Sequence, residues 1–262
     1  MIYNLFSDFF APHNEELYPP CGLFSLGHIL SLVLCLLLVA LVVFLNRKQT
    51  KDDVVRSCKP MAIIILAFEI IKIVHKFCIG QTDLDHWFPL AYCSFLIYSL
   101  FLSGFGKGIW QKMGHAFLSG PSFIAGMAFL IFPTTSLADY PLYHFLSFHS
   151  MAYHSVMVYF AVMFYKSRVM EYKFENGKYY LLFLAFFSVI AITMDYTLDC
   201  NMMFYHEPYN FPFQFIIDIY DISVVLYTIV LFIAFSTMYY IIVLIDLLVQ
   251  KLKKKGDRNV TV

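Results

Sequence analysis

Charged residues in this chain are confined to a few short segments, and long apolar runs lie between them. A helix that crosses the hydrocarbon core of a bilayer needs about 20 mostly apolar residues. Charge-free runs of this kind cover 17–46, 86–106, 113–138, 140–165 and 222–245. The chain is 60% hydrophobic and 14% charged, too little charge to cover the surface of a soluble domain of this length. It is therefore predicted to be an all-α, polytopic membrane helix bundle.

Seven transmembrane helices are predicted. They cover about 23–45, 61–80, 87–105, 113–133, 142–165, 179–197 and 216–248. The second contains several charged residues, and the last is long enough to tilt or kink. The expected organisation is an extracytoplasmic segment (1–22), a seven-helix domain (23–249) and a basic cytoplasmic tail (250–262).

Lysine and arginine are strongly segregated in this scheme. Sixteen of the 18 basic residues lie in 46–60, 106–112, 166–178 and the tail, all on one side of a seven-helix arrangement. The loops on the other side carry acidic residues, among them Glu15, Glu16, Asp83, Asp85, Asp139, Asp199 and Glu207. Because basic loops stay in the cytoplasm, we expect the N-terminus outside and the C-terminus inside. The expected location is the cell membrane, with the lipid bilayer as partner.

Other classes of protein fit the sequence less well. The formal net charge is zero, so no basic field indicates nucleic acid as a partner. The first 20 residues lack a basic region, and Asp8 and the two glutamates interrupt any apolar core, so a signal peptide is not predicted. The six cysteines lack metal-site spacing, and only Cys21, Cys78 and Cys200 are expected near the outer face. The sequence leaves their pairing and the oligomeric state open.

The two remaining basic residues lie inside the second predicted span. At about 100° per residue, Glu69, Lys72 and Lys76 fall within about 60° of one another on one helix face. Ionisable residues at membrane depth are costly and indicate either a functional path or a structural ion pair. Both interpretations stay open here. Acidic groups at the start of the last span, Asp218 and Asp221 with Gln214, are candidate partners for the two lysines.

Three histidines in the fifth span, His144, His149 and His154, are spaced five residues apart. Each is rotated by about 140° from the one before, so a straight helix cannot aim all three at one metal ion. No HxxxH or HExxH motif occurs in the sequence. We therefore predict no metal site and no cofactor, and each histidine alone is compatible with a hydrogen-bonded core residue.

Cys93 lies early in the third span, about 9 Å below the outer interface at about 1.5 Å per residue. Counted in the same way, His149 lies about 12 Å deep and His154 about 19 Å deep. A cysteine and a histidine in one pocket can act as nucleophile and base. A buried cysteine in a membrane helix is also a common apolar filler. Spacing alone does not decide between the two.

The last outer loop, DYTLDCNMMFYHEPYNFP, is rich in aromatic residues, methionine and proline. Its proline residues fix turns and prevent the sixth helix from continuing. The loop is either an interfacial cap or a lid over a pocket, with the amide of Asn201 at its mouth.

Several short motifs together resemble the YwaF family of bacterial integral membrane proteins. They are PLxxCS (Pro89 to Ser94), the helix GPSFIAGMAFLIFP, the stretch FHxxxYHS with His149 and His154, and the segment from Asp195 through Asn201 to Pro208. The resemblance covers about residues 24–245 and departs at Met202, where an aromatic residue is expected.

This family is similar to transmembrane protein 164, a cysteine-centred acyltransferase family that acts on ether phospholipids. The resemblance implies Cys93 as the nucleophile and His154, which precedes an apolar run, as the base. His149 is the second choice, although its depth is closer to that of Cys93. Substrate-binding roles are expected for Asn201, Asp195, Glu69 and Lys72. The implied substrate is a phospholipid or lysophospholipid, and the expected reaction passes through an acyl-thioester on Cys93.

Two rival functions remain. A small transporter or channel would use the charged stripe of Glu69, Lys72 and Lys76 as its path. A non-catalytic membrane scaffold would use the same stripe only to pair helices. The acyltransferase hypothesis predicts an apolar groove, open sideways to the bilayer, near Cys93.

Overall fold

Helices form all the regular structure in the part of the chain that the structure describes. The computed structural model describes residues 8–12, 16–208 and 214–260, with the backbone only for 255–260. The helices are α2 (Leu26–Leu45), α3 (Lys51–Cys78), α4 (Leu84–Trp87), α5 (Phe95–Phe105), α6 (Gly108–Leu118), α7 (Pro121–Ile131), α8 (Phe145–Lys166), α9 (Gly177–Leu198), α10 (Gln214–Ile222) and α11 (Val224–Val260). The 3₁₀ turns η1 (Tyr92–Ser94), η2 (Phe174–Asn176) and η3 (Met202–Phe204) complete the chain. The all-α prediction is confirmed.

Several of these helices match the dimensions of a bilayer. The segments that are long and apolar enough to cross it are Leu26–Leu45, Gly108–Ile131, Phe174–Leu198 and Val224–Lys254, and Tyr92–Phe105 is apolar but shorter. The two other predicted spans correspond to α3 and α8, which bury ionisable residues such as Glu69 and His149. By length and composition, the chain is a multi-pass membrane protein.

The helices differ from the predicted spans mainly at their ends. Helix α3 begins at Lys51, ten residues before the predicted span, because Thr50 and Asp53 form a capping box. The Thr50 hydroxyl accepts a hydrogen bond from the Asp53 N–H, and the Asp53 carboxylate accepts one from the Thr50 N–H at 3.0 Å. Pro60 lies within this helix without ending it. Helix α3 thus extends beyond the apolar segment into the basic region.

The fourth and seventh predicted spans are each divided. Helix α6 ends at Leu118, and α7 begins at Pro121 in the first helical position. Proline lacks the N–H that would continue the hydrogen-bonding ladder and favours an extended residue before it, so the helix breaks there. The break between α10 and α11 falls at Ser223, whose hydroxyl accepts a hydrogen bond from the Leu226 N–H.

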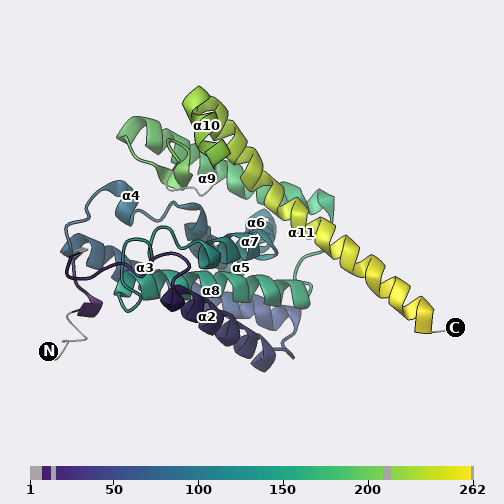
Figure 1. Cartoon of the computed structure of the whole chain (residues 1–262). Coiled ribbons are helices and arrows are strands. Elements are labelled where there is room, and N and C mark those ends of the chain that lie inside the picture. The colour runs from purple at the N-terminus through teal and green to yellow at the C-terminus, as the bar shows by residue number, and fades with distance from the viewer. Residues whose placement is uncertain (1–7, 13–15, 209–213, 261–262) are drawn as a thin grey trace.

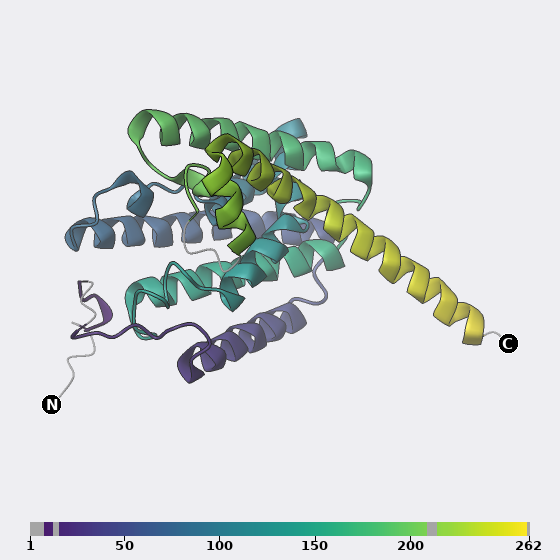
Figure 2. The same ribbon diagram turned by 45° about the horizontal axis from the view of Figure 1, so that its top comes forward.

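The helices are arranged with α2 and α9 on opposite sides of the bundle and α3, α5, α7 and α8 between them (Figures 1 and 2). Helix α2 packs along α8, and α11 packs on α9 and α7. The C-terminal part of α11 extends beyond the other helices in both views. His28 joins α2 to the end of α7: its Nδ1 accepts from the Phe24 N–H, and its Nε2 donates to the Leu130 carbonyl at 3.0 Å.

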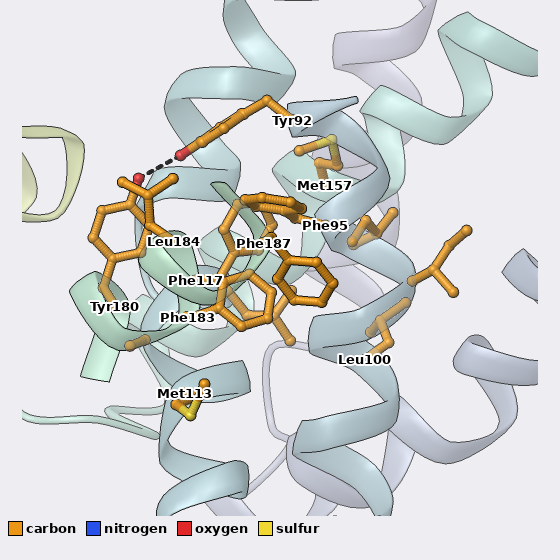
Figure 3. Packing of buried hydrophobic residues seen from close by; sticks show 14 of the residues in the cluster. Tyr92, Phe95, Leu100, Met113, Phe117, Met157, Tyr180, Phe183, Leu184 and Phe187 are labelled. Atoms are coloured by element: carbon orange, nitrogen blue, oxygen red, sulfur yellow. Dashed lines mark hydrogen bonds between the residues drawn. The ribbon is translucent and has the colours of Figure 1, made fainter. Parts of the chain in front are cut away.

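An aromatic cluster forms the centre of the core where α5, α6 and α9 meet (Figure 3). Phe95 lies with its ring centroid 5.7 Å from that of Phe117 and 5.0 Å from that of Phe183, both in edge-to-face geometry. Such pairs add about 0.5–1.5 kcal/mol beyond their buried area. The Tyr92 and Tyr180 hydroxyls are 2.6 Å apart, and Tyr180 donates to a carbonyl of α11. This cluster fixes the start of the η1–α5 segment.

Small residues let three helix pairs approach closely. Gly104 faces Lys59 of α3, Gly114 faces the backbone of α5, and Gly126 faces α8. A Cβ on Gly126 would lie 2.9 Å from a methyl carbon of Val158 and 3.0 Å from the His154 carbonyl oxygen. Close approach at small residues is the usual means of packing helices in a bilayer, where burial of apolar surface gives little driving force.

We expect Gly126→Leu to destabilise the bundle by about 1–3 kcal/mol, because α7 must move away from the α8 backbone. The matched control is Ala128→Leu, on an exposed face of the same helix. Thermal unfolding of both variants in detergent gives the comparison. Equal unfolding temperatures for the two variants and the wild type would show that the close contact between α7 and α8 is not required.

Candidate functional site

A cluster of ionisable side chains lies on the inner face of α3, where α3 meets α5 and α8. The side chain of Glu69 is 3% exposed, and its Oε1 pairs with Lys72 one turn later. Its other oxygen, Oε2, lies 3.5 Å from Nε2 of His149 on α8. One carboxylate is therefore shared between an ammonium group and an imidazole. A carboxylate buried at this depth requires such partners, because an unpaired charge would cost several kcal/mol.

The rings around His149 fix its orientation. Its imidazole stacks on Phe68 of α3, with centroids 4.3 Å apart. On the other side lies Tyr153, one turn later on α8, with centroids 5.7 Å apart. The Tyr153 hydroxyl is buried without a hydrogen bond among the described residues, and it lies within Coulombic range of both Glu69 and Cys93. Tyr153 is therefore near both the ionisable cluster and the cysteine.

Cys93 lies in η1, directly before α5, and packs against the core. Two charged groups of α3 act on its sulfur: the ammonium group of Lys72 favours a thiolate, and the carboxylate of Glu69 opposes it. Tyr98 fixes the approach to this turn by donating to the Pro89 carbonyl at 2.8 Å. The segment PLxxCS thus forms the turn that directs Cys93 toward α3.

His154 faces a different neighbour. Its ring stacks on Phe129 of α7, with centroids 3.6 Å apart. Nδ1 lies 2.7 Å from the Ser150 carbonyl and therefore carries the proton, while Nε2 is buried without a hydrogen bond among the described residues. In the described parts of the chain, neither His149 nor His154 forms a hydrogen bond with the Cys93 sulfur.

The third histidine of α8, His144, has a structural role. Its Nδ1 caps α8 by accepting from the Leu146 N–H, and its Nε2 donates to the Ala11 carbonyl at 2.9 Å. The three histidines thus have separate partners, as their five-residue spacing predicts. Across residues 8–12, 16–208 and 214–254, no group of three or more His, Cys, Asp or Glu residues is arranged to hold a metal ion.

The proposed acidic partners of the α3 lysines lie elsewhere. Asp218 accepts a hydrogen bond from Gln214 within α10, and Asp221 is exposed on the same helix. Lys72 pairs with Glu69 on its own helix instead. The hypothesis that α10 neutralises the lysines was wrong, because α10 packs on α11 and its acidic residues face outward.

Asp195 and Asn201 organise the outer loop. Oδ1 of Asp195, at the end of α9, accepts from the Met202 N–H at 2.5 Å and from the Cys200 thiol. The side chain of Asn201 accepts from the His206 and Glu207 N–H groups and donates to the Glu207 carbonyl. The amide that the sequence suggested for substrate binding is thus used in hydrogen bonds within its own loop.

The other cysteines include three that the sequence places near the outer face. All six are free, so Cys21, Cys78 and Cys200 form no disulfide. Burial, followed by the charges of Asp195 and Asp85, raises the pKa of Cys200 to about 11. Cys200 is therefore a neutral thiol at physiological pH.

A pocket of about 430 Å³ opens between the N-terminal segment and the C-terminal end of α3. It is lined by Phe10, Pro12, Ile71, Val74, His75, Cys78 and Ile79. Cys93 is not among these residues, so this pocket is not the groove that the acyltransferase hypothesis predicts.

Sequence reasoning missed Tyr153 and Phe68 as parts of the cluster. A signal for Tyr153 was present, since four residues separate it from His149 and place both on one face of α8. Phe68 had no such signal, because its contact with His149 depends on how α3 and α8 pack.

Comparison with known protein families shows which family the chain belongs to. The model of the TMEM164 family matches residues 23–239. The chain belongs to the TMEM164 family. Cys93, His149 and Glu69 all lie within the matched region. The match agrees with the resemblance to transmembrane protein 164 seen in the sequence. Searches among curated proteins and among solved structures give no match.

We expect the pair of Glu69 and Lys72 to be strongly coupled. Either Glu69→Gln or Lys72→Met alone is expected to destabilise the bundle by about 3–5 kcal/mol, because it leaves a buried charge without its partner. The double variant is expected to lose less than the sum of the two single losses. Unfolding of the four proteins in detergent measures the coupling.

The control cycle uses Glu171 and Lys173, whose side chains are 72% and 63% exposed and lie 2.7 Å apart. Exposed pairs contribute about 0–1 kcal/mol, so Glu171→Gln and Lys173→Met are expected to be additive. Additivity in the Glu69 cycle as well would show that the buried ion pair does not stabilise the bundle.

Proposed function

We propose that this chain is a lipid acyltransferase that works through an acyl-thioester on Cys93. The observation that carries the proposal is the position of Cys93. Its sulfur lies at the start of a helix within Coulombic range of the Glu69–Lys72 pair, and the Glu69 carboxylate of that pair also contacts His149. The TMEM164 family match and the membrane-spanning helices support a reaction on lipids.

In the first step, His149 takes the proton of the Cys93 thiol, and the thiolate attacks the ester carbonyl of a phospholipid. The bond between the carbonyl carbon and the glycerol oxygen breaks, and the thioester forms. The glycerol oxygen takes the proton back from the imidazolium and leaves as a lysophospholipid. Glu69 stabilises the imidazolium because its Oε2 faces Nε2.

In the second step, the hydroxyl of an acceptor lysolipid gives its proton to His149 and attacks the thioester. The carbon–sulfur bond breaks, the acyl chain passes to the acceptor, and Cys93 is released as a thiolate that recovers the proton. The Tyr153 hydroxyl is suited to donate to the oxyanion in both steps, because it has no hydrogen-bond partner among the described residues and lies within Coulombic range of Cys93.

His149 is the first choice of base in this proposal, and His154 becomes the second. His149 contacts the carboxylate whose charge also acts on Cys93. His154 has an orienting bond to Ser150 and an unprotonated Nε2, which suits a base, but its ring stacks on α7. Asp195 and Asn201 act by shaping the outer loop rather than by touching the lipid.

The proposed topology has seven spanning helices in the cell membrane. The spans are α2, α3, η1 with α5, α6 with α7, α8, α9 and α11. The basic tail of 250–262 is placed in the cytoplasm. The segregation of lysine and arginine supports the N-terminus outside, with the spanning domain at 23–249.

We expect wild-type protein, incubated in nanodiscs with an alkyne-tagged phospholipid, to acquire a label that hydroxylamine removes. Cys93→Ala is expected to abolish the label, because it removes the sulfur. His149→Ala is expected to slow labelling by about 100-fold or more, and His154→Ala less, in keeping with the usual effect of a general base.

The control is Cys58→Ala. Cys58 is also buried in the bundle, but it lies about three helical turns from Glu69 and donates to the Val54 carbonyl of its own helix. Full labelling of Cys58→Ala together with none of Cys93→Ala supports the proposal. Persistent hydroxylamine-sensitive label on folded Cys93→Ala would rule out Cys93 as the nucleophile.

For the topology, we expect a membrane-impermeant maleimide to label Cys78 on intact cells, since this residue is exposed at the outer end of α3. A Lys48→Cys variant that also carries Cys21→Ser, Cys78→Ser and Cys200→Ser, so that no native cysteine remains near the outer face, is expected to react only after the membrane is opened. Labelling of the Lys48→Cys variant on intact cells would reverse the proposed orientation.

A further inference from the structure

Lys76 continues the inner face of α3 toward the outer surface. It lies seven residues after Glu69, two helical turns on, and four residues after Lys72. At about 100° per residue it falls within about 20° of Glu69 on the helix face. The same face buries Cys58 and Ile65 farther down. Lys76 is only partly buried, so it marks the outer end of this face.

The charge of Lys76 is not neutralised by a partner within the described residues. It forms no ion pair there, and the charges that act on it are those of Lys72, Glu69 and Asp139. Glu69 is already shared between Lys72 and His149. Asp139, in the loop before α8, lies in Coulombic range of Lys76 without pairing with it.

Lys72 and Lys76 thus bring two ammonium groups to one face of α3, and among the described residues only Lys72 has a carboxylate as an ion-pair partner. An ammonium group at such a position is costly unless an anion joins it. The neighbouring residues Ile70, Ile71 and Val74 are apolar and about half exposed, at 51%, 50% and 56%. The outer part of α3 therefore presents positive charge beside a surface suited to lipid chains.

We propose that Lys76, together with Lys72, binds the phosphate group of the phospholipid acyl donor and so positions its ester at Cys93. The inference rests on the proposed function and adds a positioning residue and a requirement for phosphate in the donor. Lysine binds phosphate as a point charge, and its flexible stem tolerates different headgroups.

The spacing along α3 fits this assignment. The charges of Glu69 and Lys72 act on Cys93, so the reacting ester lies near their level. Lys76 lies one turn beyond Lys72, a rise of about 6 Å toward the outer surface. In a glycerophospholipid the phosphate is joined to the ester by the short glycerol backbone, which bridges a comparable distance. A phosphate at Lys76 would thus place the ester beside the cysteine.

Binding is tested apart from catalysis in full-length Cys93→Ser protein in nanodiscs. The probes are a photoactivatable phosphatidylcholine and a diacylglycerol with the same acyl chains and no phosphate. We expect about tenfold more crosslinking with the phosphatidylcholine, the gain usual for a charge-assisted contact. Lys76→Gln is expected to remove this preference, and Lys76→Arg to keep it.

The matched control is Lys107→Gln, an exposed lysine in the loop between α5 and α6, which is expected to keep the preference. A purely structural role of Lys76 would lower crosslinking of both lipids equally and would overturn the proposal. So would equal crosslinking of the two lipids in the Cys93→Ser protein, a comparison that does not depend on the folding of a Lys76 variant.

A further arm adds millimolar inorganic phosphate. No displacement of the phosphatidylcholine is expected, and displacement would show that the site takes free phosphate rather than a lipid. Acylation of the Cys93 protein is measured separately. Crosslinking that depends on Lys76 without any thioester would leave the phosphate site standing and remove the acyltransferase. A thioester formed equally well from diacylglycerol would support the acyltransferase and overturn the phosphate site at Lys76.

Discussion

The shared carboxylate of Glu69 is the interaction on which the arrangement of α3, α5 and α8 depends. Burying a charge in an apolar bundle has a desolvation cost, which only nearby charged or hydrogen-bonding partners can offset. Lys72 comes from the same helix and follows from the sequence, whereas His149 comes from α8. This second contact ties α8 to α3 and sets the depth at which Tyr153 meets Cys93.

Packing supplies the precision that this cluster requires. The aromatic rings of α5, α6 and α9 hold the start of the η1–α5 segment, and the hydrogen bond between Tyr92 and Tyr180 links it to α11. The glycine contacts of α5 with α3, and of α7 with α8, bring backbones close enough for short side chains to meet. Cys93 is thus held by packed elements on several sides, which is the kind of support that the proposed nucleophile needs.

Local hydrogen bonds explain why some candidate residues do not reach this cluster. The Asn201 amide was a reasonable candidate for substrate binding, because an amide without a protein partner can hydrogen-bond a ligand. Instead, it forms hydrogen bonds with the N–H groups and the carbonyl of its own loop. His154 shows the same principle on α8, where a five-residue step from His149 turns it toward Phe129. Asp218 and Asp221 remain on the exposed face of α10.

The sequence by itself determined that the chain is helical and inserted in a membrane, because charge-free runs of bilayer length leave few alternatives. It also determined that Glu69, Lys72 and Lys76 share one face of α3, since helix periodicity is a local property. Only the tertiary structure decided that His149, rather than His154, meets Glu69 and that Tyr153 lies near Cys93. Those contacts depend on how α3, α5 and α8 rotate and approach, which is set by close packing between residues far apart in the chain. The break at Pro121 lies between these cases, since proline predicts it locally while packing of α6 and α7 on different neighbours maintains it.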